Sequence, residues 1–300
     1  MTHFIDDKEA KMQQSLDENV LNDWFAVTSI ERLDAEIRVQ TVLLGQPIIV
    51  WRDKTHGLHA NERMPDNLNG REFAVQQRHG FIWVSLGAPR KELFALPEFD
   101  EPGRRFINAG TFGVKSSGLR VIENFLDMGH FPYVHTDILG KDPHSEVPDY
   151  KVTTDPQTGE IWATECRFWQ PKAAASAAGG LHVAYTYRIT QPFTAVLYKT
   201  CPTRTDARDV IGVYVQPISE DECRATLWLL LFDDVATDAE IIGFQQTIFA
   251  QDRPILENQV PKRLPLDMKS EVPARADAGS TAYRRWLRQI GMQYGVHKTA

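Results

Sequence analysis

The chain has 300 residues, of which 42% are hydrophobic, and a formal net charge of −7 from 33 Lys and Arg against 40 Asp and Glu. This length can close a sizeable core in one or two domains, and the absence of a basic run argues against a nucleic-acid partner. The longest apolar stretch, near Leu227 to Phe232, is too short to span a membrane, and the first residues lack a signal-peptide pattern. We therefore expect a cytoplasmic globular protein that binds neither nucleic acid nor membrane.

The first third of the sequence predicts a small antiparallel β domain. Alternating and β-branched residues predict strands over 37–44, 48–51 and 81–86. Prolines and glycines cluster between Ala88 and Gly103, which predicts a linker and a boundary that divides the chain into domains 1–105 and 106–300.

The remaining two thirds predict an α+β domain with an antiparallel sheet. An apolar stripe predicts a helix over 118–130, and capping residues at Thr237 or Asp238 begin a later one. A last helix contains Tyr283 to Ile290. The Ala-rich segment 173–180 predicts a mobile loop. Strands are predicted over 161–169, 182–189, 194–198, 210–216 and 225–232.

Three cysteines, Cys166, Cys201 and Cys223, are too few and too widely spaced for a disulfide framework or a C-x-x-C metal site. We expect reduced, structural thiols.

Polar residues interrupt the apolar surface of the predicted helix. Asn124, Asp127 and His130 recur every three residues, so on one helix they share a face and Asp127 can accept a hydrogen bond from a histidine ring. His130 and His135 are five apart and converge on one ion only if the helix ends or widens between them, as Pro132 would allow. These histidines alone fit a metal site or ordinary hydrogen-bonded residues.

A carboxylate, Asp252, lies on the predicted apolar stripe of the late helix. The stripe consists of Ile241, Phe244, Ile248 and Ile255. Because an unpaired buried charge is costly, Asp252 requires either a basic partner such as Arg167 or a metal ion. Two imidazoles and one carboxylate form the facial triad that binds Fe(II) for dioxygen chemistry. Zinc hydrolases use similar ligands, but their His-Glu-x-x-His arrangement is absent here.

The segment Asn-Phe-Leu-Asp-x-x-His-x-x-x-x-His at 124–135, with Asp-Arg-Pro-Ile-Leu-Glu-Asn-Gln at 252–259, resembles the catalytic α-subunit of Rieske-type non-haem iron oxygenases. Residues 22–25, 43–53 and 78–87 resemble the framework of that family's N-terminal Rieske domain. The resemblance implies a remnant Rieske-like β domain followed by a helix-grip, START-like catalytic domain. It also implies iron ligands at His130, His135 and Asp252, and a bridging carboxylate at Asp127. We count Asn124 with Asp127 as a catalytic residue.

The sequence departs from this family in one respect. The family binds its [2Fe–2S] cluster with C-x-H and C-x-x-H pairs, whereas all three cysteines here follow the iron motif and none precedes a histidine at that spacing. Residues 57–71 occupy the position of the family's cluster-binding loops but lack those loops. We therefore expect His56, His59 and His79 to be surface or turn residues. An oxygenase of this kind needs a partner reductase that carries the [2Fe–2S] cluster and uses NADH and flavin.

A split arrangement of this kind resembles bacterial methylxanthine N-demethylation. The resemblance implies oxidation of the N7-methyl group of 7-methylxanthine, a small aromatic heterocycle, with release of xanthine and formaldehyde. Two alternatives stay open: ring hydroxylation or O-demethylation of another aromatic substrate, and a non-catalytic scaffold subunit. The resemblance is also compatible with a heteromeric companion subunit.

The late helix also suggests part of the substrate pocket. Gln245 and Phe249 precede Asp252 by one or two turns on its side, so they either line the pocket or pack in the core. Four aromatic residues lie on or beside strands that could line the same cavity: Trp169, Tyr185, Tyr187 and Phe193.

Overall fold

A computed structural model describes residues 17–63, 70–204, 206–267 and 270–298. Among these residues, one compact unit contains the chain through residue 41 together with 47–93 and 288–294. The other contains 42–46, 94–287 and 295–298. The boundary at residue 105 stays a prediction. No helix within the described ranges is long and apolar enough to cross a membrane.

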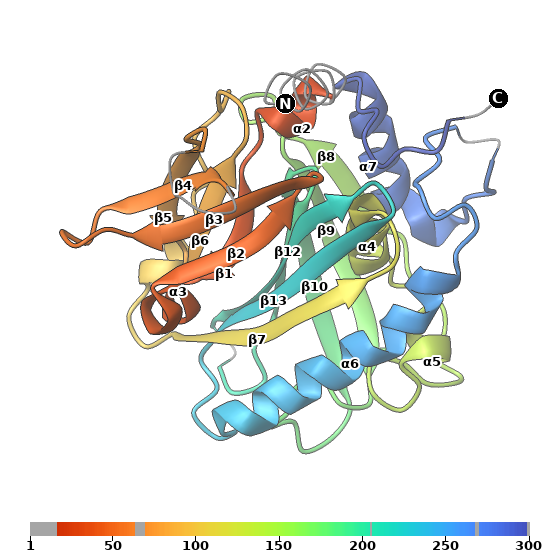
Figure 1. Cartoon of the computed structure of the whole chain (residues 1–300). Helices are drawn as coiled ribbons and strands as arrows, with labels where there is room; N and C mark the ends of the chain where they lie inside the picture. The colour runs from red at the N-terminus through yellow and green to blue at the C-terminus, as the bar shows by residue number, and fades with distance from the viewer. Residues whose placement is uncertain (1–16, 64–69, 205, 268–269, 299–300) are drawn as a thin grey trace. The chain divides into compact units, whose positions relative to one another are not determined.

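The first unit is built mainly from two antiparallel three-stranded sheets (Figure 1). One has the strand order β1 (Phe25–Ser29), β6 (Phe81–Ser85), β5 (Ala74–Arg78), and the other β2 (Arg38–Leu43), β3 (Gln46–Arg52), β4 (Leu58–Glu62). Its short helices are α2 (Glu18–Leu21) and α3 (Ile30–Glu36). The strand predictions are confirmed. Every residue of β6 is buried, and this burial on both faces accounts for its nearly continuous apolar sequence.

The histidines of the first unit lie in turns or on strands. His56 and His79 adopt positive φ angles of 65° and 50°. The His59 ring stacks on Trp51, and its Nε2 lies 3.0 Å from Asp53 Oδ2. Part of the segment where the cluster loops would stand, residues 64–69, lies outside the described residues.

The second unit is built on one seven-stranded antiparallel sheet of order β7-β13-β12-β11-β10-β9-β8. The strands are β7 (Arg105–Val114), β8 (Lys151–Thr154), β9 (Ile161–Gln170), β10 (Leu181–Gln191), β11 (Thr194–Thr200), β12 (Arg208–Ser219) and β13 (Glu222–Leu231). The helices are α4 (Gly118–Leu126), α5 (Phe131–Val134), α6 (Asp238–Asn258) and α7 (Ala278–Gln289), with the 3₁₀ turns η1 (Pro97–Asp100) and η2 (Arg275–Asp277). This is the predicted α+β fold.

Helices cover the sheet where its strands carry apolar side chains. Figure 1 shows α6 running along the sheet beside β7, and α4 packs against β11, β12, β13 and α6. Tyr214 and Trp228 pack together with their ring planes tilted by 36° and their centroids 5.1 Å apart, and both are almost fully buried. Gly212 makes room for this pair, because a Cβ atom there would lie 2.0 Å from the Trp228 ring.

The predicted helix over 118–130 ends earlier than expected. Helix α4 stops at Leu126, and Asp127 adopts an extended conformation with φ −82° and ψ 122°. The Asp127 side chain accepts a hydrogen bond from the Gly129 N–H at 2.7 Å, a local turn that competes with helix continuation. The break therefore precedes His130, and α5 then begins with Pro132 in its first turn.

The buried stripe of α6 also differs from the predicted one. Ile255 is 47% exposed, whereas Ile241, Phe249, Asp252 and Leu256 are buried. The reason is helical periodicity, because the residue one full turn beyond Asp252 is Leu256 rather than Ile255. The predicted N-cap is confirmed, since Thr237 and Glu240 form a capping box.

A buried arginine joins α4 to the C-terminal part of the second unit. The Arg120 side chain is 2% exposed and donates to Glu123 at 3.1 Å and to Glu271 at 2.7 Å. Arg284 on α7 donates to the same two carboxylates. Each arginine thus has two partners, which is the condition under which buried charges are tolerated.

This network predicts acid sensitivity at Glu271. Partial burial raises its pKa, but hydrogen bonds from Arg120 and Arg284 outweigh that effect and lower it from 4.5 to about 2. Its stabilising contribution is therefore present above pH 4.5 and is lost as the pH falls toward 2. Chemical denaturation should show Glu271→Gln less stable than the unmodified protein at pH 7, with the gap narrowing below pH 4.5. A gap independent of pH would contradict this account.

Candidate metal centre

Three side chains from separate elements meet at one point. His130 and His135 flank the four-residue helix α5, and Asp252 lies on α6. The His130 and His135 Nε2 atoms are 3.1 Å apart, and Asp252 Oδ1 lies 3.2 and 3.0 Å from them, respectively. All three offer a ligand atom within 4.8 Å of the others. The structure thus brings the three predicted ligands together.

Hydrogen bonds on the far side of each ring fix the histidine tautomers. His130 Nδ1 lies 3.0 Å from Asp127 Oδ2, and His135 Nδ1 lies 2.8 Å from the Gln251 amide oxygen. Since these oxygens only accept hydrogen bonds, each Nδ1 carries a proton, and the Nε2 atom of each ring is the one that faces Asp252. The sequence analysis did not predict the role of Gln251. The one signal for it was its position directly before Asp252, the buried carboxylate of α6.

The electrostatics of the cluster favour a positive charge at its centre. Burial disfavours a charged His130, but hydrogen bonds to Asp127 and Asp252 outweigh this effect and raise its pKa to about 9. Burial also disfavours the Asp252 carboxylate, yet the two histidines hold its pKa below the usual value. Two imidazole nitrogens and one carboxylate oxygen match the donor set of mononuclear non-haem Fe(II), so these residues fit that ion.

The two polar residues at the end of α4 adjoin the same cluster. Asn124 Nδ2 donates to Asp252 Oδ1 at 3.4 Å, and Asp127 contacts His130 although the helix has already ended. The alternative of a buried salt bridge is not observed: in the part of the chain that the structure describes, Asp252 pairs with no Arg or Lys, and Arg167 is exposed.

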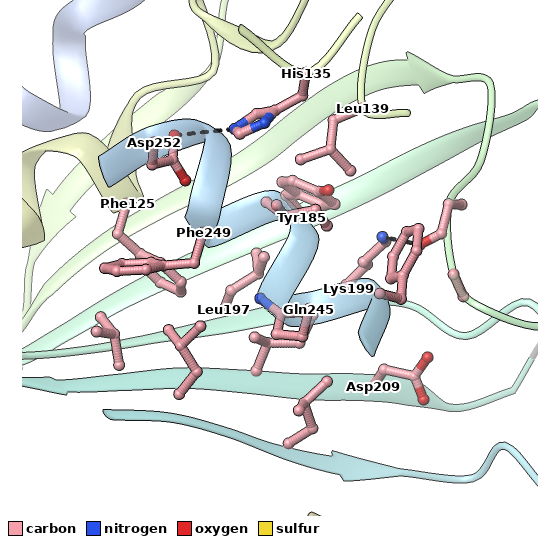
Figure 2. A pocket seen from close by; sticks show the side chains of 18 of the residues that line it. Phe125, His135, Leu139, Tyr185, Leu197, Lys199, Asp209, Gln245, Phe249 and Asp252 are labelled. Carbon is pink, nitrogen blue, oxygen red and sulfur yellow. Dashed lines mark hydrogen bonds and ion pairs between the residues drawn. The ribbon is translucent and has the colours of Figure 1, made fainter. Parts of the chain in front are cut away.

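A mostly apolar cavity extends from the cluster between α6 and the sheet (Figure 2). Gln245 and Phe249 both line it, on the same helix as Asp252. Of the four aromatic candidates, Tyr185 and Tyr187 line it, whereas Trp169 and Phe193 do not. Other lining side chains are Val121, Phe125, Phe131, Leu139, Leu197, Lys199, Asp209, Ile211, Val213, Leu227, Leu229, Leu231, Asp233, Ile241, Phe244 and Ile248. Residues 173–175, from the predicted loop, also contribute to its wall.

A second hollow lies on the other side of His130. Its lining includes Asn124, Asp127 and His130, together with the exposed apolar residues Ile255 and Val272. Asn124 and His130 therefore border both spaces, and the Asp127 side chain, 29% exposed, belongs to the second. Asp127 therefore connects this hollow to the His130 ring.

Comparisons with known proteins identify the family of the chain. The family model described as the vanillate O-demethylase oxygenase C-terminal domain matches residues 114–292. The probable methylxanthine N7-demethylase NdmC of Pseudomonas sp. (strain TJI-51) is 44% identical over 277 residues, which cover 92% of this chain and 96% of that protein. Methylxanthine N1-demethylase NdmA of Pseudomonas putida is 25% identical, over 80% of this chain and 68% of that one.

Solved structures share the fold. NdmA from Pseudomonas putida CBB5 with caffeine superposes with a TM-score of 0.73 at 19% identity, covering 90% of this chain and 91% of that one. Dicamba monooxygenase bound to dicamba gives a TM-score of 0.70 at 16% identity, covering 90% and 97%. The chain belongs to the Rieske-type non-haem iron oxygenases, in the group defined by the vanillate O-demethylase oxygenase C-terminal domain.

Proposed function

We propose that this protein oxidatively N-demethylates a methylxanthine, converting 7-methylxanthine into xanthine and formaldehyde with dioxygen. The proposal rests mainly on one observation, the cluster of His130, His135 and Asp252 beside a mostly apolar cavity. The choice of substrate is supported by the relative named as an N7-demethylase, at 44% identity over nearly the whole chain.

In this proposal, His130, His135 and Asp252 hold Fe(II), while Asp127 and Gln251 orient the two rings. The bound ion supplies dioxygen activation. The apolar cavity walls exclude water and hold the flat heterocycle, and Gln245 offers an amide for a polar ring atom.

The reaction balances with an external electron source. One atom of dioxygen is inserted into a C–H bond of the N-methyl group, and the other leaves as water after uptake of two electrons and two protons. The N-hydroxymethyl product then breaks its C–N bond, releasing formaldehyde and returning a proton to the ring nitrogen. Each turnover therefore needs two electrons from a donor.

We assign this donor role to a separate reductase that carries a [2Fe–2S] cluster and takes electrons from NADH through flavin. The three cysteines all follow the iron motif, and each is buried and free, so they do not form the family's cluster site. The hollow at Asp127 supports electron entry there, because one carboxylate contacts His130 and also faces the surface. The companion subunit and the cytoplasmic location stay predictions.

Two alternatives lead to different results in one assay. Another aromatic substrate would leave iron binding intact but give no formaldehyde from 7-methylxanthine. A scaffold subunit would bind no iron. The cluster disfavours the scaffold, since a buried carboxylate facing two imidazoles gains little stability without a cation.

The first test is metal content and turnover of Asp252→Ala. The purified protein is reconstituted with Fe(II) and assayed with 7-methylxanthine, NADH and a Rieske-containing reductase. The unmodified protein should hold one iron per chain and release formaldehyde, whereas the variant should lose both because one of three ligands is gone. Arg253→Ala, which changes an exposed neighbour on α6, serves as the control. Full iron content in Asp252→Ala would refute the ligand assignment.

Asp127→Asn should separate iron binding from electron entry. Because Asp127 is not a ligand, the variant should retain most of its iron while reductase-dependent formaldehyde production falls at least about tenfold. Asp277→Asn changes another carboxylate of the same hollow that does not contact His130, so its activity should stay near normal. Equal losses of activity in both variants would argue against a special role for Asp127.

Gln251→Leu tests the support of His135. Without the amide oxygen, the His135 ring loses its orienting partner, so iron affinity should fall about 10- to 100-fold. Gln251→Glu, which keeps an acceptor, should restore most of it. Equilibrium dialysis against Fe(II) measures the effect, and an unchanged affinity in Gln251→Leu would show that the contact is dispensable.

A further inference from the structure

Three buried, charged side chains that the proposed chemistry does not use line the substrate cavity: Lys199, Asp209 and Asp233. Asp233 accepts hydrogen bonds from the Val235 and Ala236 N–H groups, so the pair of opposite charge on the sheet is Lys199 and Asp209. Lys199 and Asp209 line the cavity and are 5% and 4% exposed. Figure 2 shows both beyond Gln245, at the end away from Asp252 and His135. The cavity therefore has a metal-binding end and a charged end.

The register of the sheet explains why Lys199 and Asp209 are neighbours on adjacent strands. Lys199 on β11 pairs directly with Asp209 on β12, and Tyr185 on β10 pairs with Lys199. Two residues along each strand, the next row on the same face includes Leu197 and Ile211. Further cavity residues on this face are Val213, Leu227, Leu229 and Leu231. A charged row thus interrupts an otherwise apolar sheet face.

The Lys199 ammonium has unused hydrogen-bonding capacity. It carries three N–H donors, and within the described residues it donates one hydrogen bond, to the Ala173 carbonyl. No ion pair within 4.0 Å joins it to Asp209. Burial lowers the Lys199 pKa to about 8, although Asp209 acts in the opposite direction and the Nζ atom lies 5.7 Å from the Tyr185 ring centroid.

Asp209 is likewise incompletely compensated. Its Oδ1 accepts from the Phe232 N–H at a long 3.4 Å, and the neighbouring Cys201 thiol also favours the charged carboxylate. Burial raises the Asp209 pKa above its usual value, against these contacts. A donor and an acceptor therefore stand side by side in the cavity wall, each able to bind a further polar group.

We propose that Lys199 and Asp209 recognise the imide edge of the oxopurine, where a ring N–H adjoins a carbonyl group. The inference rests on the proposed function, because placing the N7-methyl group at the metal end directs the opposite, pyrimidinedione edge toward the charged end. Lys199 donates to the carbonyl oxygen and Asp209 accepts from the ring N–H. The pair is thus a specificity determinant for the number of methyl groups on the substrate.

The chemistry gives this pair discriminating power. A methyl group on the recognised nitrogen removes the N–H donor and leaves the buried Asp209 carboxylate without its partner. Sites built to hydrogen-bond a substrate N–H reject analogues that lack it far more strongly than apolar pockets reject an added methylene. We expect the protein to prefer 7-methylxanthine over its N1- or N3-methylated analogue by on the order of 100-fold in kcat/KM.

The test compares substrates rather than absolute rates. Iron-loaded protein with its reductase is assayed on 7-methylxanthine, 1,7-dimethylxanthine and 3,7-dimethylxanthine. Asp209→Asn should reduce the preference for 7-methylxanthine at least about tenfold, because its amide no longer demands an N–H partner. Asp206→Asn, which changes an exposed carboxylate outside the cavity, should leave the preference unchanged. The analogue with the lowest kcat/KM identifies the ring nitrogen whose N–H donates to Asp209.

Lys199→Met provides an independent measurement. The ammonium also holds the Ala173 carbonyl, so a purely structural role would lower the melting temperature and leave KM unchanged. Recognition instead predicts at least a tenfold higher KM for 7-methylxanthine with iron content retained. If Asp209→Asn keeps the full preference, or Lys199→Met keeps the normal KM, the inference is wrong. If the unmodified protein releases no formaldehyde from any of the three substrates, the result refutes the proposed function, on which this inference rests.

Discussion

The convergence of three electron-pair donors, His130 Nε2, His135 Nε2 and Asp252 Oδ1, is the constraint on which the rest of the site depends. Such atoms repel one another unless a cation or a shared proton lies between them. The outer hydrogen bonds to Asp127 and Gln251 hold the rings in this orientation. The fold therefore maintains a local arrangement that is unfavourable by itself and that a cation bound between the three atoms would relieve.

Each element near the site serves this geometry. The early end of α4 and the single turn of α5 reverse the chain so that two histidines five residues apart face one point. The long helix α6 then supplies Asp252 at the centre and Phe249 and Gln245 along the cavity. The antiparallel sheet forms the opposite wall, and its strict alternation decides which side chains the substrate meets.

Much of this could be predicted from the sequence, because the strands and α6 carry strong periodic signals and Asp252 contradicts its apolar surroundings. The end of α4 could not, since the Asp127 side chain competes with the helix in a way that spacing does not reveal. Gln251 and the pair of Lys199 and Asp209 depend on contacts between distant segments. Strand register brings Lys199 and Asp209 opposite each other, and no local pattern specifies that register.

Under the proposed function, the two hollows around His130 separate electron entry from substrate binding. One side of this ring borders the apolar cavity, and the other meets Asp127 and a surface flanked by exposed Ile255 and Val272. In this proposal, an external donor docked at this surface approaches His130 without entering the substrate cavity. A partner that carries its own cluster therefore needs to contact only the surface at Asp127. In this proposal, the absence of cluster ligands from the sequence is compatible with an oxygenase site at His130, His135 and Asp252.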